Sequence, residues 1–364
     1  MLRRPPAPDD PAGDRAGDAA EVATVAAVRD EIVAWFRAGH RDLPWRRTRD
    51  PYAIWVSEVM LQQTRVETVV PYYARFLARY PTVERLADAA IDDVLAAWSG
   101  LGYYRRARLL HAGATHVARA LGGVVPTTAE SLREVPGIGR YTAGAIASIA
   151  HGEATPLVDG NVARVLSRWA CLDEDPKSSA GAAALWDLAA ALVARDAPGD
   201  WNQALMELGA TVCTPRDPRC EACPVADACA ARRVGREREI PAAAKRKASP
   251  VVALVAIVAR DRRGRVLLAQ RGPEGTFGGL WEPPMAEAPA EPPIDAEGVR
   301  VVGRVRHVLS HRRLEVEVKV ALRARAPRGA LGGYERFAWT SPESFGELGL
   351  ATFARKVLAA AGCG

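Results

Sequence analysis

The chain has 364 residues, of which 49% are apolar and 25% charged, and its formal net charge is +6 with a sequence pI near 9.1. No stretch approaches the roughly 20 consecutive apolar residues that a membrane helix requires, so a membrane-spanning protein is not expected. The excess of Lys and Arg suits a polyanionic partner such as a nucleic acid, although an arginine- and alanine-rich composition can raise the pI without one.

Four segments with different patterns follow one another along the chain. Residues 1–21 contain acids and lack the apolar core of a signal peptide, so we expect a disordered tail and a cytoplasmic protein. Residues 22–233 repeat apolar positions at three- and four-residue steps, which predicts a helical domain. Residues 234–249 are charged and contain Pro241, as linkers do. Residues 250–364 include alternating runs such as RLEVEVKVALRAR, which predict a smaller domain of strands and helices.

Three segments of the helical part contain polar residues or glycines in positions that suit function. Glu58 lies on a predicted helix in SEVMLQQT, where a solvated carboxylate is the default interpretation. Gly137 and Gly139 in PGIGR belong either to a tight turn or to a hairpin whose backbone N–H groups bind a phosphate at a helix N-terminus. Asp159 in VDGNV precedes an apolar stripe, so helix capping competes with a role in a cleft.

Four of the six cysteines lie close together with the spacing Cys-x6-Cys-x2-Cys-x5-Cys. They are Cys213, Cys220, Cys223 and Cys229. In a protein without an export signal, such a cluster more often binds metal than forms disulfides. Four thiolates in one loop can complete a tetrahedral zinc site or hold an iron-sulfur cubane, and the residue types alone allow both.

The cysteine spacing, PGIGR and VDGNV together resemble the helix-hairpin-helix DNA glycosylases, the superfamily of endonuclease III and the MutY adenine glycosylases. This resemblance covers about residues 25–230 and implies one [4Fe-4S] cluster on the loop 213–229, with Gly137 and Gly139 on the DNA backbone. The bifunctional lyases of this superfamily place a nucleophilic lysine where this chain has Tyr141. A phenol has no amine and cannot form a Schiff base, so we expect a monofunctional enzyme.

LPWR, SEVMLQQT, GLGYYRRARLL and WNQALMELGATVC resemble the MutY family, which removes adenine mispaired with 8-oxoguanine or guanine. By position, the resemblance implies Glu58 as the acid and Asp159 as the carboxylate, with Tyr141 and Asn161 lining the sugar. Residues implied to contact the extruded adenine are Trp45, Arg46 and Gln203. Those implied to probe or wedge the duplex are Leu61, Gln63, Thr64, Leu101 and Tyr103. The tryptophan and the two leucines are residue types more often found in a core.

The two carboxylates are expected to hold opposite protonation states. Glu58 must be protonated near neutral pH to donate to N7 of adenine, which a dry apolar pocket would favour by raising its pKa. Asp159 must stay ionised to stabilise the oxocarbenium-like sugar. The alternatives are another monofunctional mismatch glycosylase, for example one acting on thymine in G·T pairs, and a non-catalytic DNA-binding relative. In each case the partner is double-stranded DNA, and we expect a monomer.

VLLAQRGPEGTFGGLWEPP resembles the Nudix-like C-terminal domain of the same family. The next segment, MAEAPAEPPIDAEG, lacks the carboxylate-rich helix that holds magnesium in Nudix hydrolases, so pyrophosphate hydrolysis is not expected. RHVLSHRRLEV aligns with the loop that touches 8-oxoguanine and implies roles for Leu309, Ser310 and His311. Leu309 stands where the family often has an aromatic residue, so it is a smaller wedge. His307 is expected to face solvent.

Overall fold

The structure is a computed structural model that describes residues 26–242 and 249–363. The predicted tail, 1–21, lies outside the described residues, as do residues 243–248 of the predicted linker. The chain forms two compact units, and both are discontinuous in sequence. Of the described residues, the first unit contains 26–54, 126–134 and 138–242, and the second contains 55–125, 135–137 and 249–363.

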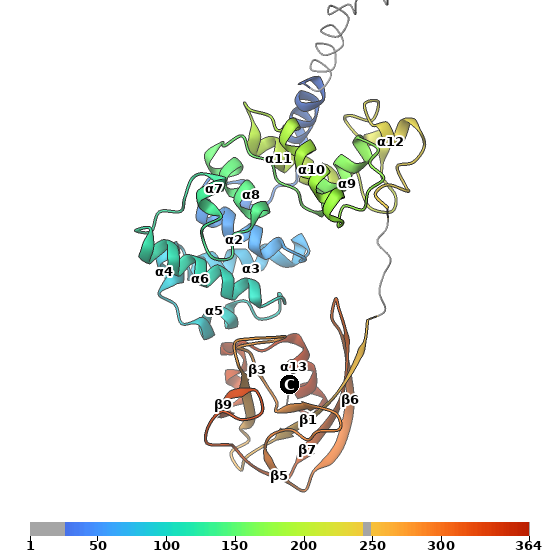
Figure 1. The fold of residues 1–364 in the computed structure, drawn as a ribbon. Coiled ribbons are helices and arrows are strands. Elements are labelled where there is room, and N and C mark those ends of the chain that lie inside the picture. Colours follow the sequence, from blue (N-terminus) through green and yellow to red (C-terminus); the bar gives the residue numbers. More distant parts are fainter. Residues whose placement is uncertain (1–25, 243–248, 364) are drawn as a thin grey trace, which may run out of the picture. The chain divides into compact units, whose positions relative to one another are not determined.

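The first unit is helical (Figure 1). Its elements are a helix over residues 26–39, η1 (Pro44–Arg46), the start of α2 (Pro51–Leu61), α7 (Ala129–Leu132), α8 (Arg140–His151), α9 (Gly160–Trp169), α10 (Ser179–Leu192), α11 (Pro198–Thr211), η2 (Cys220–Ala222) and α12 (Ala230–Arg233). Short polar side chains begin several of these helices. Thr128 caps α7 and Ser178 caps α10, each by accepting a backbone N–H three residues later, as N-cap residues do.

The second unit contains helices from the middle of the chain. They are the remainder of α2, α3 (Val66–Arg79), α4 (Val83–Ala87), α5 (Ile91–Ala97) and α6 (Arg105–Ala120). Both α4 and α5 pack against α6. Apolar side chains at helical spacing form the core between them, where the rings of Phe76 and Trp98 meet edge to face at 5.7 Å. The predicted helical character of this part of the chain is confirmed.

The rest of the second unit contains strands, a 3-10 helix and an α-helix. Its elements are β1 (Val251–Ala259), β2 (Val266–Arg271), β3 (Trp281–Glu282), β4 (Met285–Glu287), β5 (Asp295–Glu297), β6 (Arg300–Val308), β7 (Arg313–Ala321), β8 (Arg323–Arg325), β9 (Tyr334–Thr340), η3 (Pro342–Glu347) and α13 (Thr352–Ala360). One sheet has the order β4-β1-β7-β6 and another β3-β2-β9, while β5 pairs with β8. The helix α13 packs against β6 and β7 (Figure 1). The prediction of mixed strands and helix is confirmed.

Strand β1 is one of the two central strands of the larger sheet. It pairs parallel with β7 along its whole length and antiparallel with β4, and it is buried from Leu254 to Ala259. Burial on both faces explains why this strand reads as a continuous apolar run. In the described part of the chain, no helix is long and apolar enough to cross a membrane. The domain boundaries stay a prediction, and Ile240 of the predicted linker is buried in the first unit.

Candidate functional site

Asp159 caps helix α9 in the first unit. Its Oδ1 accepts hydrogen bonds from the backbone N–H of Asn161 at 2.9 Å and of Val162 at 2.7 Å, and its Oδ2 accepts one from the Asn161 side chain at 3.0 Å. Burial raises the pKa of this carboxyl, and the three hydrogen bonds and Arg164 oppose that effect. The capping interpretation is therefore correct, and one carboxylate oxygen remains bound only to a side chain.

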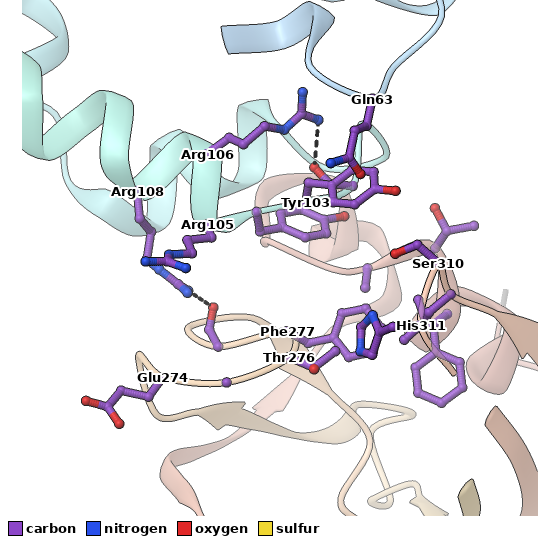
Figure 2. Close-up of a pocket in the computed structure, with 18 of the residues that line it drawn as sticks. Gln63, Tyr103, Arg105, Arg106, Arg108, Glu274, Thr276, Phe277, Ser310 and His311 are labelled. Atoms are coloured by element: carbon purple, nitrogen blue, oxygen red, sulfur yellow. Dashed lines mark hydrogen bonds between the residues drawn. The ribbon is translucent and has the colours of Figure 1, made fainter. Parts of the chain in front are cut away.

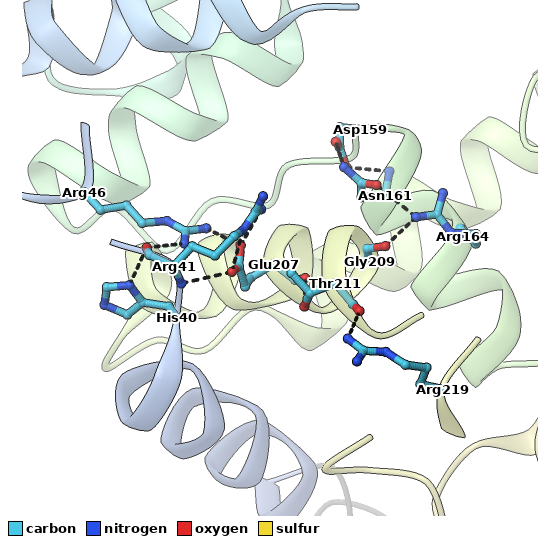
Figure 3. Close-up of polar contacts among 10 residues, drawn as sticks. All are labelled: His40, Arg41, Arg46, Asp159, Asn161, Arg164, Glu207, Gly209, Thr211 and Arg219. Carbon is cyan, nitrogen blue, oxygen red and sulfur yellow. Dashed lines mark hydrogen bonds and ion pairs between the residues drawn. The ribbon is translucent and has the colours of Figure 1, made fainter. Parts of the chain in front are cut away.

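A chain of hydrogen bonds leads away from Asp159 (Figure 3). Nη2 of Arg164 donates to Oδ1 of Asn161 at 2.9 Å and to the carbonyl of Gly209 on α11 at 2.7 Å. A side chain at Gly209 would not fit, since its Cβ would lie 2.6 Å from Cβ of Asn161. The absence of a side chain thus lets α9 and α11 approach closely, and Nε of Arg164 reaches the carbonyl of Cys213 at 2.7 Å.

Glu207 on α11 is more deeply buried than any other ion-paired side chain among the described residues of the first unit. The sequence patterns did not predict this ion pair. The Glu207 side chain is 2% exposed, and it accepts hydrogen bonds from both Arg41 and Arg46 (Figure 3). Arg46 also stacks over the ring of Phe36 at 5.1 Å. Although burial alone would raise the pKa of Glu207, the two arginines lower it to about 2. Glu207 lies four residues after Gln203 and therefore on the same face of the helix, and this spacing could have indicated that Glu207 belongs to the same site.

The stability of the protein is expected to depend on Glu207 at acidic pH. Because its pKa is lowered in the folded state, its contribution is complete above the unfolded value near 4.5 and is lost as the pH falls toward about 2. That contribution is about 3.5 kcal/mol at neutral pH, because the pKa falls from 4.5 to about 2 and one pH unit corresponds to about 1.4 kcal/mol. Urea unfolding of wild type and Glu207→Gln at pH 7 and pH 3 measures it.

The variant should lose less unfolding free energy between these two pH values than the wild type does. Glu31→Gln, at an exposed position of the same unit, serves as the control and should follow the wild type. Parallel pH profiles for wild type and Glu207→Gln would show that Glu207 carries no acid-labile stability.

The remaining implied adenine and sugar contacts of the first unit lie in regular elements. Trp45 is buried in η1, and Gln203 is buried on α11, where its Nε2 donates to the carbonyl of Gly199 at 3.3 Å. Tyr141 lies in the first turn of α8, and its hydroxyl is 3.3 Å from Sδ of Met206. The contacts of Trp45, Arg46, Tyr141 and Gln203 with DNA stay predictions.

The glycine hairpin leads into α8. Gly137 has φ +84°, a left-handed conformation that favours glycine, and a Cβ there would lie 2.8 Å from Cβ of Leu109. Gly139 is the N-cap of α8 and is exposed, with open space where a Cβ would lie. The first backbone N–H groups of α8 therefore follow a glycine that has open space beside it. This arrangement suits the predicted phosphate contact.

The four clustered cysteines form no disulfide and lie close enough to influence one another. The pKa of the Cys223 thiol is raised to about 11, mainly by burial and also by the charges of the other three cysteines. Four thiolates so close require a compensating cation, so the donor set fits a metal cluster. Among the described residues, no three His, Cys, Asp or Glu side chains converge on a site for a single metal ion.

The buried side chain of Arg168 on α9 holds the cysteine loop. Its guanidinium donates to Sγ of Cys213 at 3.3 Å and to the carbonyl oxygens of Thr214, Pro215 and Ile240 at 2.7, 3.1 and 2.8 Å. The loop thus closes onto the same helix that Asp159 caps.

Glu58 lies in the second unit, in the middle of α2. Glu58 is only 4% exposed, and its neighbours Trp55, Val59 and Met60 are fully or almost fully buried. The default expectation of a solvated carboxylate is therefore wrong. A buried acid on an apolar helix matches the environment that the resemblance implies for a proton donor.

The second unit also contains a cleft of about 1200 Å³ (Figure 2). Its lining includes five of the residues implied to contact the duplex: Gln63, Tyr103, Leu309, Ser310 and His311. Sequence reasoning did not single out four further lining residues: Arg105, Arg108, Phe277 and Phe353. Leu61, Thr64 and Leu101 are not part of the lining, and Leu101 is 5% exposed, as a core residue would be. Their contacts with DNA stay predictions.

His307 lines this cleft and is half-buried, so the expectation that it faces solvent is wrong. Its ring centroid lies 5.4 Å from that of Phe353, which also stacks with Phe277 at 5.5 Å. Burial lowers the pKa of His307, and the nearby charge of Lys356 lowers it further. The contact with α13 could not be foreseen because Phe353 is distant in sequence.

Comparisons with known proteins define the class of this protein. Residues 56–191 match the HhH-GPD superfamily of base excision DNA repair proteins, residues 213–229 match the iron-sulfur binding domain of endonuclease III, and residues 255–360 match the NUDIX domain. The fold and these matches together define a base excision repair glycosylase of the helix-hairpin-helix class, with an iron-sulfur loop and a Nudix-like C-terminal part. The predicted iron-sulfur cluster is thereby confirmed.

Individual relatives narrow the class. The chain is 38% identical over 407 residues to the adenine DNA glycosylase of Homo sapiens, covering 93% of this chain and 74% of that protein. It is 39% identical to the adenine DNA glycosylase of Rattus norvegicus, covering 93% and 78%. Among solved structures, a thermostable thymine-DNA glycosylase matches with a TM-score of 0.54 and 30% identity, covering 59% of this chain and 99% of that one. The chain belongs to the adenine DNA glycosylase family and is an enzyme of base excision repair.

Proposed function

We propose that the enzyme acts as a monomer on duplex DNA, extrudes adenine paired with 8-oxoguanine or guanine, and hydrolyses its N-glycosidic bond without cleaving the strand. The cleft of the second unit carries the specificity part of this proposal. It is lined both by Gln63 and Tyr103 of the helical part and by Leu309–His311 of the Nudix-like part (Figure 2). A purine held there would meet candidate wedge and recognition residues together.

The hydroxyl of Ser310 and the imidazole of His311 suit recognition of 8-oxoguanine. Both residues are exposed and both line the cleft, so their polar atoms are available to a ligand. A side-chain hydroxyl or imidazole can bond to the edge of a base. Leu309 offers an apolar contact in place of aromatic stacking. The preference for 8-oxoguanine would then rest on hydrogen bonds more than on a stacked ring.

The proposed chemistry divides the work between two carboxyl groups. Adenine must first leave the helix stack to become accessible, at a cost of a few kcal/mol. Glu58 then gives its proton to N7 of adenine, which turns the base into a neutral leaving group. Burial of Glu58 on α2 supports this role because it excludes the water that would compete for the proton.

Asp159 stabilises the sugar cation that forms as the bond to adenine breaks. Three donors from Asn161 and Val162 orient its carboxylate, and a preorganised charge in a poorly solvated site acts strongly on a developing cation. Water then adds to the sugar carbon and releases one proton, which balances the proton that Glu58 gave to adenine. Tyr141 has no amine to form a Schiff base, which supports excision without strand cleavage.

We further propose that the cluster is of the [4Fe-4S] type. The loop supplies four thiols from one segment, and Arg168 donates to one of the four sulfurs. When bound, the cluster would close the loop 213–229 and thereby stabilise the end of α11. Cytoplasmic localisation follows as a proposal from the cysteine chemistry, since free thiols persist in a reducing compartment.

Single-turnover excision on duplexes that differ only in the base opposite adenine tests the proposed substrate. We expect the rate to be highest opposite 8-oxoguanine, lower opposite guanine and lowest opposite thymine, with strand breaks only after alkali. Ser310→Ala should reduce the preference for 8-oxoguanine over guanine about tenfold, the effect of one lost base contact. Ser341→Ala, outside the cleft lining, is the matched control. Equal rates opposite every base, or excision of thymine from G·T, would refute the proposal.

A further inference from the structure

Three of the cleft residues have an unfavourable backbone conformation: Phe277, with φ +63°, and two residues beside the ends of helices α2 and α6. Gln63 has φ +58° and Tyr103 has φ +48°, and both lie in the left-handed region that residues with a side chain seldom adopt. Both are well exposed, Tyr103 at 43%, and both line the cleft. Such a conformation persists only where the surrounding structure enforces it, and it occurs preferentially at functional sites.

The guanidinium of Arg106 on α6 binds the chain on both sides of Gln63. Its Nη1 donates to the carbonyl of Val59 at 2.7 Å, to that of Met60 at 2.9 Å and to that of Gln62. Its Nη2 donates to Oγ1 of Thr64 at 3.0 Å. The last carbonyls of α2 lack partners within the helix, and Arg106 satisfies them from a different helix.

The same guanidinium binds the turn that carries Tyr103. Its Nη2 is 3.3 Å from the carbonyl of Gly102, and the backbone N–H of Arg106 donates to the carbonyl of Tyr103 at 2.9 Å. The guanidinium carbon lies 5.3 Å from the centroid of the Tyr103 ring and 5.6 Å from that of Trp98, within cation–π range. One side chain thus contacts the backbone beside both left-handed residues.

We propose that Arg106 is a positioning residue that holds Gln63 and Tyr103 together as one wedge, so that both enter the duplex when adenine is extruded. The inference rests on the proposed function of these two residues. Arginine suits the task because its planar fork directs donors to two separate segments, whereas the ammonium of lysine is a single point. Arg106 is 9% exposed, and burial lowers its pKa to about 10, so it stays charged at neutral pH.

A double-mutant cycle tests the inference. Arg106→Lys should lower single-turnover excision from an A·8-oxoguanine duplex about tenfold, within the range that coupled residues show. In the double variant Gln63→Ala/Tyr103→Ala, Arg106→Lys should lower the excision rate less than about twofold, because the wedge that Arg106 positions is gone. If Arg106 only supports the fold, Arg106→Lys should lower the excision rate by the same factor in both backgrounds. That result would overturn the inference.

A second substrate separates positioning from general damage. An adenine opposite an abasic-site analogue has no partner to leave, so unstacking is easier and the wedge matters less. On this substrate, the excision rate of Arg106→Lys should be less than about twofold below that of the wild type. An equal loss on both substrates would contradict the inference. The failure of the proposed function itself would show in the wild type, as equal rates opposite every base.

Two further variants keep the test decisive. Arg119→Lys, at an exposed position near the end of the same helix, should leave excision unchanged. If Arg106→Lys does not fold, Arg106→Gln keeps an amide donor in place of the guanidinium and should show the same substrate dependence. An Arg106→Gln enzyme with equal losses on both substrates would also overturn the inference.

Discussion

Replacing Asp159 with asparagine is expected to lower single-turnover adenine excision by about 10³-fold or more, because the negative charge beside the developing sugar cation is lost. Stability should hardly change, since asparagine caps a helix as well as aspartate does. The structure makes this variant informative because Asp159 both caps α9 and holds a candidate catalytic carboxylate. Rapid-quench kinetics and urea unfolding on the same preparation measure the two effects.

Asp159→Ala provides the comparison for the capping role. It removes the charge and the cap together, so it should lose excision and also about 1 kcal/mol of unfolding free energy. Near-wild-type excision by Asp159→Asn would show that the carboxylate acts only as a cap, and the proposed chemistry would be wrong.

Replacing Glu58 with glutamine is expected to lower excision by roughly 10²–10⁴-fold, the usual contribution of a general acid. Glutamine has nearly the same shape and fits the same buried position on α2, but its amide cannot give a proton to adenine. Binding to a duplex with a non-cleavable adenine analogue should persist, because the contacts with DNA are unaffected. Fluorescence anisotropy measures binding, and single-turnover kinetics measures the chemical step.

Glu67→Gln, at an exposed position on α3, is the control and should match the wild type in both assays. Excision by Glu58→Gln within a few-fold of the wild type would remove Glu58 from the mechanism. A parallel loss of binding and excision would instead point to a damaged fold.

The local patterns in the sequence predicted the features that depend on neighbouring residues. The cysteine spacing predicted the loop 213–229, and an aspartate before an apolar stripe predicted the cap of α9, because both depend on contacts within a few residues. The change from helical to alternating periodicity predicted the order of helical and mixed parts for the same reason. The helix pattern alone did not indicate that Glu58 is buried, since helix α2 is apolar nearly all round and no periodicity distinguishes its buried side; only the resemblance implied a dry pocket.

Other features depend on residues that are distant in the chain, and only the tertiary structure revealed them. Glu207 meets Arg41 and Arg46 across more than 160 positions, and His307 packs on Phe353. Gln63 and Tyr103 have left-handed conformations, and Arg106 binds carbonyls of another helix close to Gln63. Local sequence determined the elements, the metal-binding loop and the class of chemistry. The packing of distant segments decided which charges are buried and how the wedge residues are held, because burial and long-range hydrogen bonds form only when the chain is folded.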